Sequence, residues 1–195
     1  MLRRIFTFTC CFAFIALAAS ADEPLPAPYP PGVSAVHRVG ETMVNGPNAG
    51  QARSMICDLA GRPAVLIYAR EFNPAVESLL TKLDAVARKG QERKMRSACI
   101  LLTEKDDDKK NLQEFDRRAK LEATMLATHP PRDDNFYFGT GGFRHKLQPE
   151  AEVTVIVFQK LKVQSSRAFR KGELTERKIG EVVNSLAALL PPMKI

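Results

Sequence analysis

The chain has 195 residues, of which 45% are hydrophobic and 26% are charged, which is enough apolar material for one globular domain with extensions. Its formal net charge is +7 at pH 7, but basic and acidic side chains alternate along the sequence, and the most basic cluster, residues 92–96, is short. Because a nucleic-acid site needs several converging cations, we expect no nucleic-acid partner.

Residues 1–21 have the features of an export signal. A basic start at residues 3–4 precedes an apolar run over residues 5–17, and Ala19-Ser20-Ala21 offers a small-x-small cleavage site. The apolar run is shorter than the roughly 20 residues that a membrane-spanning helix needs. We therefore expect a cleaved signal peptide and an exported mature protein, periplasmic or extracellular, with no membrane span.

Residues 22–50 are predicted to be a proline-rich and turn-rich extension. Five prolines fall within residues 22–34 without any hydrophobic periodicity, so we expect an extended tether that buries no core. The clearest turn after it is Asn45-Gly46-Pro47-Asn48. The folded domain is expected to occupy residues 51–192, with a short strand within Arg53–Leu59 near its start.

The most informative stretch is a buried strand that runs directly into an amphipathic helix. Ala64–Tyr68 is short, apolar and partly β-branched, as in a central strand covered on both faces. Asn73 can cap the following helix, and Pro74 suits its first position because proline has no N–H to leave unsatisfied. Apolar residues then recur every three or four positions until Gly90, which ends the helix.

The rest of the chain gives further periodic segments. Residues 121–150 are the hardest part to assign. Within them, Gly139-Thr140-Gly141-Gly142 is interpreted as a turn and not as a phosphate-binding loop, because no Lys-Ser/Thr pair follows. The predicted elements are a buried strand at Ser97–Thr103, a polar helix at Asp106–Lys120, a short strand at Thr124–Thr128, a hairpin of Val153–Phe158 and Val163–Phe169, and a final helix with apolar positions from Ile179 to Leu190.

Two cysteines lie beyond the predicted signal, Cys57 and Cys99. Cys99 lies in an apolar run and is expected to be buried, whereas Cys57 precedes Asp58 and is expected to be partly exposed. Export would permit a disulfide between them, but sequence cannot show that the two sulfurs are close, so this stays open. His129 and His145 have no partner at ligand spacing, so we expect no metal and no cofactor.

The order β-α-β-α-β-β-α, with a hairpin before the last helix, resembles the thioredoxin fold, an α/β fold with a central mixed sheet flanked by helices. Several motifs, spread over residues 53–190 with 121–150 unaligned, are also similar. They are Ala64–Phe72, which resembles the family's strand into the W-C-G-P-C turn; Val153–Phe158 with Val163, which resembles its P-T-(apolar)-F…V hairpin; Lys171-Gly172-Glu173-Leu174, which resembles its K-G-x-L; and Asp58–Pro63, which resembles the D-x-x-G-K lead-in of exported thioredoxin-like and peroxiredoxin-like proteins.

The resemblance also shows what has been lost. It places the attacking cysteine at Asn73 and the resolving cysteine at Val76, and neither residue can supply the thiolate that disulfide exchange needs. The family's cis-proline, which offers its backbone to an extended substrate, falls on Val153. A cis bond before a residue other than proline costs about 2.5–4 kcal/mol, so we expect a trans bond and an altered docking edge. The Asn-Gly turn of the hairpin is replaced by Lys160-Leu161, a less favourable sequence for this turn.

Two function classes remain. The first is an exported, redox-inactive thioredoxin-like domain that acts as a binding or accessory module for a protein partner the sequence does not identify. The alternative is a thiol-disulfide oxidoreductase or peroxiredoxin-like antioxidant that uses Cys57, with Arg53 or Arg62 lowering the pKa of its thiol. A copper- or haem-handling relative would need paired cysteines and a converging histidine, which this chain does not offer. Thiol labelling across pH separates the first two classes.

Overall fold

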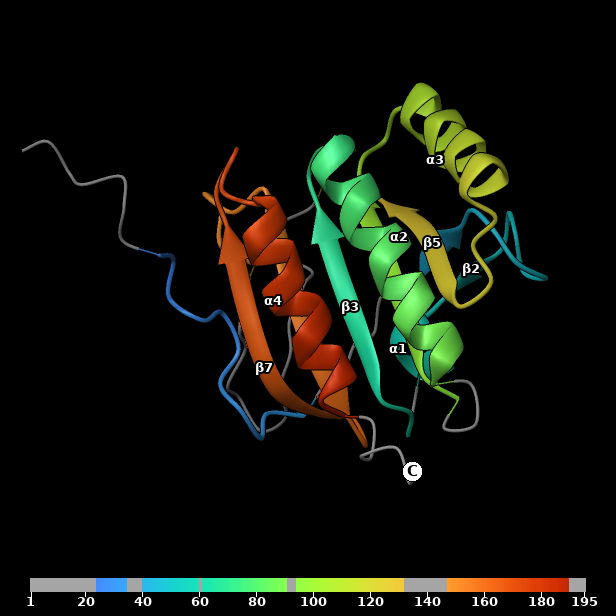
Figure 1. The fold of residues 1–195 in the computed structure, drawn as a ribbon. Helices are drawn as coiled ribbons and strands as arrows, with labels where there is room; N and C mark the ends of the chain where they lie inside the picture. The colour runs from blue at the N-terminus through green and yellow to red at the C-terminus, as the bar shows by residue number, and fades with distance from the viewer. Residues whose placement is uncertain (1–23, 35–39, 60, 91–93, 132–146, 190–195) are drawn as a thin grey trace, which may run out of the picture.

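The computed structural model of the chain describes residues 24–34, 40–59, 61–90, 94–131 and 147–189. Four parts of the sequence-based predictions lie outside these residues: the signal peptide, the glycine-rich turn, His145 and Leu190 at the end of the last helix. Within them, seven strands form one mixed sheet that is flanked by helices (Figure 1). The predicted α/β fold class is confirmed.

The strand order across the sheet is β2-β1-β5-β4-β3-β6-β7. Strand β3 runs parallel to β4 and antiparallel to β6, and β4 runs parallel to β5. The strands are β1 Glu41–Met43, β2 Ala52–Arg53, β3 Ala64–Ala69, β4 Arg96–Leu102, β5 Thr124–His129, β6 Val153–Gln159 and β7 Lys162–Phe169, and the helices are α1 Met55–Leu59, α2 Pro74–Lys89, α3 Asp106–Ala119 and α4 Glu176–Ala187.

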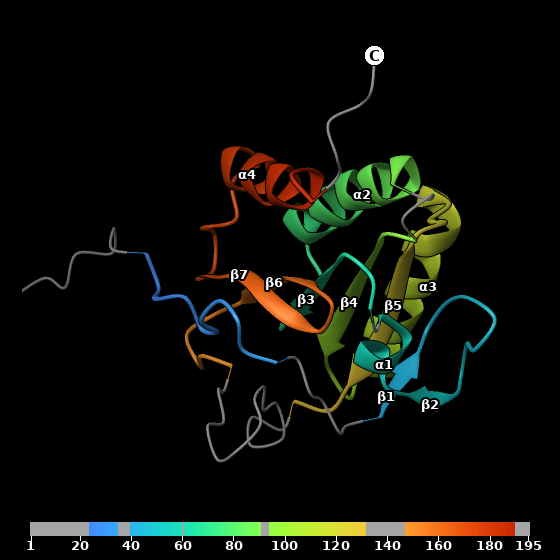
Figure 2. The same ribbon diagram turned by 90° about the horizontal axis from the view of Figure 1, so that it is seen from below.

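The core has two parts, one on each face of the sheet. Helices α2 and α4 cover one face and the short helix α1 lies on the other (Figure 2). Successive residues of β3 alternate between these parts: Val65 and Ile67 belong to the α2 side, whereas Leu66 belongs to the α1 side. Because β3 is buried on both faces, its sequence is a continuous apolar run instead of an alternating one.

The hairpin turn between β6 and β7 has a backbone conformation that its two central residues adopt unfavourably. Lys160 has a φ of 52° and Leu161 a φ of 60°, and positive φ at both central residues is the requirement of a type I′ turn. Neither residue is a glycine or an asparagine, so each carries the steric cost of a left-handed conformation. The predicted two-residue hairpin is confirmed, and its turn is formed by residues that are unfavourable there.

The prediction of a strand within Arg53–Leu59 is wrong for most of that stretch. Strand β2 stops at Arg53, and α1 follows it. Met55, Ile56 and Leu59 are buried by this single helical turn. A helix of five residues is too short for hydrophobic periodicity to distinguish it from a strand.

The N-terminal segment, residues 24–34, is not the tether that its composition predicted. Tyr29 is 0% exposed and belongs to the core on the α1 side of the sheet. Its backbone N–H donates to Ser166 Oγ at 2.9 Å, and Ser166 Oγ donates to its carbonyl at 2.8 Å. The prediction that this stretch buries no core is therefore wrong.

Strand β1 also lies within the stretch that the sequence placed in the extension. It pairs with β2 on one side and β5 on the other, with Thr42 opposite Thr128. Met43 is buried, and the fully buried carboxylate of Glu41 accepts a hydrogen bond from Met55 N at 3.0 Å. Part of residues 22–50 is thus integral to the sheet. Among the described helices, none is long and apolar enough to cross a membrane.

Candidate functional site

The candidate site is the joint between β3 and α2. Asn73 is the N-cap of α2: its backbone is extended (φ −134°, ψ 170°), and its Oδ1 accepts hydrogen bonds from the N–H groups of Ala75 and Val76, each at 3.1 Å. Pro74 occupies the first helical turn, and Gly90 closes the other end by donating to the Val86 carbonyl at 3.1 Å. The predicted helix start and end are confirmed.

The other end of the Asn73 amide contacts the residue that precedes strand β6. Its Nδ2 donates to Glu152 Oε1 at 2.7 Å. The orientation of this amide is fixed by its partners, because only the oxygen can accept from two backbone N–H groups and only the nitrogen can donate to a carboxylate. Glu152 immediately precedes Val153, so the residue at the position that the resemblance assigns to the attacking cysteine contacts the residue before the position assigned to the cis-proline.

The position assigned to the resolving cysteine is part of the core. Val76 is 0% exposed and packs within the cluster between α2 and the sheet. Its side chain therefore has a packing role, while its N–H is bound by Asn73.

The edge at Val153 is closed by main-chain hydrogen bonds. In the described residues every peptide bond is trans, including the one before Val153. The Glu152 N–H donates to the Phe169 carbonyl at 2.8 Å, and the Glu152 carbonyl accepts from the Arg70 N–H at 2.9 Å. Both main-chain groups of Glu152 are thus used inside the sheet, and an extended peptide would find no unused partner on this residue.

Charged side chains surround this end of the sheet and are held by local contacts. Arg70 Nε donates to the Ala151 carbonyl at 3.0 Å. Lys171 forms an ion pair with Glu71 at 2.8 Å, and this contact raises the pKa of Lys171. Together they border a shallow cavity of about 230 Å³ lined by Arg70, Glu71, Pro149, Glu150, Ala151, Glu152 and Lys171.

Helix α3 also contacts the joint. The Phe72 ring packs edge-on against Phe115 of α3, with ring centroids 5.3 Å apart. Arg118 of the same helix lies 5.9 Å from the centroid of the Phe115 ring and forms an ion pair with Glu77 of α2 at 2.7 Å. The joint is therefore held by three elements of the fold.

Neither described thiol lies at this joint. Cys99 sits in the middle of β4, opposite Ile67, and burial raises the pKa of its thiol to about 12. Cys57 is an exposed residue of α1, and this helix lies on the face of the sheet opposite α2 (Figure 2). Both are free thiols in this structure, so the disulfide that the sequence left open is not formed here. The predicted burial of Cys99 and exposure of Cys57 are confirmed.

The basic residue nearest Cys57 in the sequence is engaged elsewhere. Arg53 binds the Asp58 carboxylate with two hydrogen bonds, from Nε at 3.0 Å and from a terminal nitrogen at 2.7 Å, and these raise the pKa of Arg53. Of the two guanidinium groups that the alternative function offered for thiol activation, Arg53 and Arg62, the first is thus directed at a carboxylate.

The described residues contain no group of three His, Cys, Asp or Glu side chains that could hold a metal ion. His129 is buried at the end of β5, where its Nδ1 lies 2.6 Å from the Pro130 carbonyl oxygen. A ring nitrogen in contact with a carbonyl is typical of a structural histidine.

Comparison with known proteins identifies the fold. No protein-family model matches the chain, and no curated protein matches it in sequence. Its structure is similar to a peroxiredoxin-like protein from Aquifex aeolicus (TM-score 0.55, 15% identity, covering 83% of this chain and 88% of that one). It is also similar to a yeast mitochondrial 1-Cys peroxiredoxin (0.57, 14%, 86% and 83%) and to a putative thiol:disulfide interchange protein, DsbE, from Chlorobium tepidum (0.50, 13%, 80% and 98%).

The fold is thioredoxin-like. At identities of 13–15% the likeness establishes this architecture and leaves the chemistry to the chain's own residues. In this thioredoxin-like domain, Glu152 is the site residue that sequence analysis missed. The signal was an acidic residue beside Val153, but its partner Asn73 is 79 positions away, and only the fold brings the two together.

Proposed function

We propose that this protein is an exported, redox-inactive thioredoxin-like domain that acts as a binding or accessory module. The observation that carries the proposal is the hydrogen-bonded pair of Asn73 and Glu152 at the position where the resemblance puts the attacking thiol. An amide that caps a helix and binds a carboxylate stabilises the joint. It offers no nucleophile for a disulfide or a peroxide.

The sulfur chemistry of the remaining residues supports the same proposal. Disulfide exchange proceeds through a thiolate, and a thiol with a pKa of about 12, as for Cys99, stays protonated at physiological pH. Cys57 lies on the opposite face from α2, so it cannot complete a reaction centre with Asn73 or Val76.

A binding role at this end of the sheet would depend on side chains. Because the main-chain groups of Glu152 are used within the sheet, a partner would contact the exposed charges of the Glu71–Lys171 pair and of Glu150 beside it. We infer a protein partner with complementary charges, met outside the cytoplasm. The basic start, apolar run and cleavage site within residues 1–21 support export.

The proposal is tested by turnover. The purified protein is assayed for dithiothreitol-dependent reduction of insulin and for consumption of hydrogen peroxide, beside a Cys57→Ser variant. Both proteins should match the rate of reductant alone. A rate above that background which disappears in Cys57→Ser would overturn the proposal.

The exposure of Cys57 favours one second candidate, a thiol oxidoreductase or peroxiredoxin-like antioxidant that uses this single thiol. Such an enzyme needs a thiolate near neutral pH. The rate of alkylation of Cys57 between pH 5 and pH 10 measures its pKa directly. A midpoint near the ordinary cysteine value of about 8.5 removes this candidate, and a midpoint below about 7 sustains it.

A further inference from the structure

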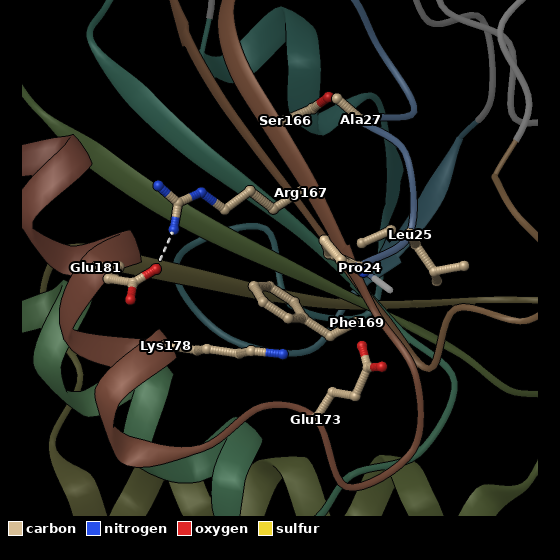
Figure 3. Close-up of a pocket in the computed structure, with 10 residues that line it drawn as sticks. Pro24, Leu25, Ala27, Ser166, Arg167, Phe169, Glu173, Lys178 and Glu181 are labelled. Atoms are coloured by element: carbon tan, nitrogen blue, oxygen red, sulfur yellow. Dashed lines mark hydrogen bonds and ion pairs between the residues drawn. The ribbon is translucent and has the colours of Figure 1, made fainter. Parts of the chain in front are cut away.

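A second cavity lies at the outer edge of the sheet and plays no part in the joint at Asn73. Its volume is about 280 Å³, and it is enclosed by the N-terminal segment, strand β7 and the first turns of α4 (Figure 3). It is lined by Pro24, Leu25, Ala27, Ser166, Arg167, Ala168, Phe169, Glu173, Lys178 and Glu181.

The two carboxylates of this cavity already have guanidinium partners. Glu181 accepts from Arg167 at 2.9 Å, a contact drawn in Figure 3, and from Arg177 at 2.5 Å. Glu173 accepts from the backbone N–H of Arg170 at 2.9 Å and from its guanidinium at 3.1 Å. Both carboxylates are therefore satisfied within the protein.

Lys178 supplies the second cation of the cavity lining, and the hydrogen bonds from Arg170, together with the charge of Lys178, lower the pKa of the Glu173 carboxyl. Among the described residues no carboxylate lies within ion-pair distance of the Lys178 ammonium group, which sits 5.7 Å from the centroid of the Phe169 ring. Figure 3 shows its side chain extending from α4 beneath that ring. The lining has two cations, Arg167 and Lys178, and two carboxylates, Glu173 and Glu181, and these carboxylates are also bound by Arg170 and Arg177 from outside the lining.

The walls beside Lys178 are apolar. Phe169 is 5% exposed and forms the floor, and Pro24 and Leu25 of the N-terminal segment form the opposite side (Figure 3). Apolar walls with a few polar groups are the composition of a small-molecule site, and the volume of about 280 Å³ lies just below the usual range of about 300–1,000 Å³.

We propose that this cavity binds a small amphipathic monoanion, a carboxylate on a short aliphatic or aromatic body. The carboxylate of the ligand forms an ion pair with the ammonium group of Lys178, and its apolar body packs against Phe169, Pro24 and Leu25. A cation or a neutral molecule of the same shape would gain the apolar contact without the ion pair. This inference does not rest on the redox-inactive role, because it concerns other residues and another measurement.

Isothermal titration calorimetry of the purified protein tests the proposal with hexanoate, hexan-1-ol and hexylammonium as probes. Hexanoate should bind saturably and about tenfold more tightly than either other probe, as expected for one charge-assisted contact. Lys178→Gln should weaken hexanoate binding by about the same factor and leave hexan-1-ol unchanged, whereas Lys178→Arg should retain it. Lys162→Gln, an exposed lysine of β7 outside the cavity, is the matched control and should bind like the wild type.

Circular dichroism of each variant verifies that it is folded. Absence of saturable hexanoate binding to the wild type overturns the proposal, and so does equal affinity of the wild type and Lys178→Gln. Equal binding of hexanoate and hexylammonium also overturns it, because the selectivity for an anion would then be missing.

Discussion

At the residue scale, the decisive side chain is Asn73. Its oxygen binds two N–H groups at the start of α2, and its nitrogen binds Glu152. Asparagine is among the best N-cap residues, whereas a thiol is a weak hydrogen-bonding group. By the resemblance this amide stands where the attacking thiol would be, and here it holds the start of α2 in place.

This role predicts a stability loss in Asn73→Ala. Removal of an N-cap side chain costs about 0.5–2 kcal/mol, and Glu152 also loses the donor that lies 2.7 Å from its carboxylate. Urea unfolding measures the change. Asn184→Ala, at an exposed position inside α4, is the matched control and should shift the free energy of unfolding by less than about 0.5 kcal/mol. Equal effects of the two substitutions would show that Asn73 is not a structural cap.

The two described cysteines should differ sharply in reactivity. Cys99 is buried with a thiol pKa of about 12, so at pH 8 it is protonated and shielded, whereas Cys57 is exposed. Brief alkylation of the native protein followed by peptide mass spectrometry should modify Cys57 alone. The same treatment in urea should modify both. Rapid native labelling of Cys99 would contradict the core described above.

At the element scale, the N-terminal segment completes the sheet edge at β7. Its main chain exchanges hydrogen bonds with Val163, from Gly32 N at 2.8 Å and to Val33 O at 2.9 Å, and Tyr29 is anchored to Ser166. Proline at every second position from residue 24 to residue 30 leaves few N–H donors for a further strand. Proline at a sheet edge is one of the devices that limit pairing between molecules.

The anchor at Ser166 can be tested by removal of one atom. Ser166→Ala leaves the N–H and carbonyl of Tyr29 without the partner that lies at 2.9 and 2.8 Å, and a buried unsatisfied group costs about 1–3 kcal/mol. We expect lower stability and faster proteolysis within residues 24–34. Ser165→Ala, the neighbouring residue on β7, should behave like the wild type; if both variants are cleaved equally fast, the anchor is not at Ser166.

The β6–β7 turn predicts a stabilising substitution. Lys160 is exposed and has a φ of 52°, a conformation that asparagine adopts more readily than lysine. Lys160→Asn should raise the free energy of unfolding by several tenths of a kcal/mol, up to about 1. Lys162→Asn, two residues later within β7, should lower it, because asparagine is unfavourable in strands. Thermal unfolding of the pair measures both, and a loss in Lys160→Asn would contradict the turn assignment.

Elements with a local signal were predictable, and those defined by distant contacts were not. Strand β3 and helix α2 could be read from the apolar run at Ala64–Tyr68 and the Asn73-Pro74 cap, because each signal lies within a few residues. Helix α1 is a single turn, and β1 is short, so neither repeats a pattern. The burial of Tyr29 depends on Ser166, 137 positions away, which no local pattern reports.

The candidate site divides in the same way. Its position and its lack of sulfur follow from the sequence order and the resemblance at Asn73, Val76 and Val153. The contacts within the site could not be predicted from the sequence. The hydrogen bond between Asn73 and Glu152 and the paired main chain beside Val153 arise only when β3 and β6 pair.

At the scale of the whole molecule, the chain has a thioredoxin-like fold in which neither described cysteine lies at the joint between β3 and α2. The sheet, helix α2 and the β6–β7 hairpin are present as the fold requires. Cys57 belongs to α1, on the face of the sheet opposite α2, and Cys99 lies inside the core. In the proposed function, the side chains of Asn73 and Val76, and not the fold, exclude redox chemistry at this joint.

The most direct measurement places cysteines at Asn73 and Val76. Insulin reduction is compared among the wild type, Cys57→Ser and a double variant, Asn73→Cys with Val76→Cys, after circular dichroism has shown that each is folded. A thiol at this helix N-terminus should have a lowered pKa, so the double variant should reduce insulin faster than dithiothreitol alone, while the other two should not. A wild-type rate equal to or above that of the double variant would contradict the account.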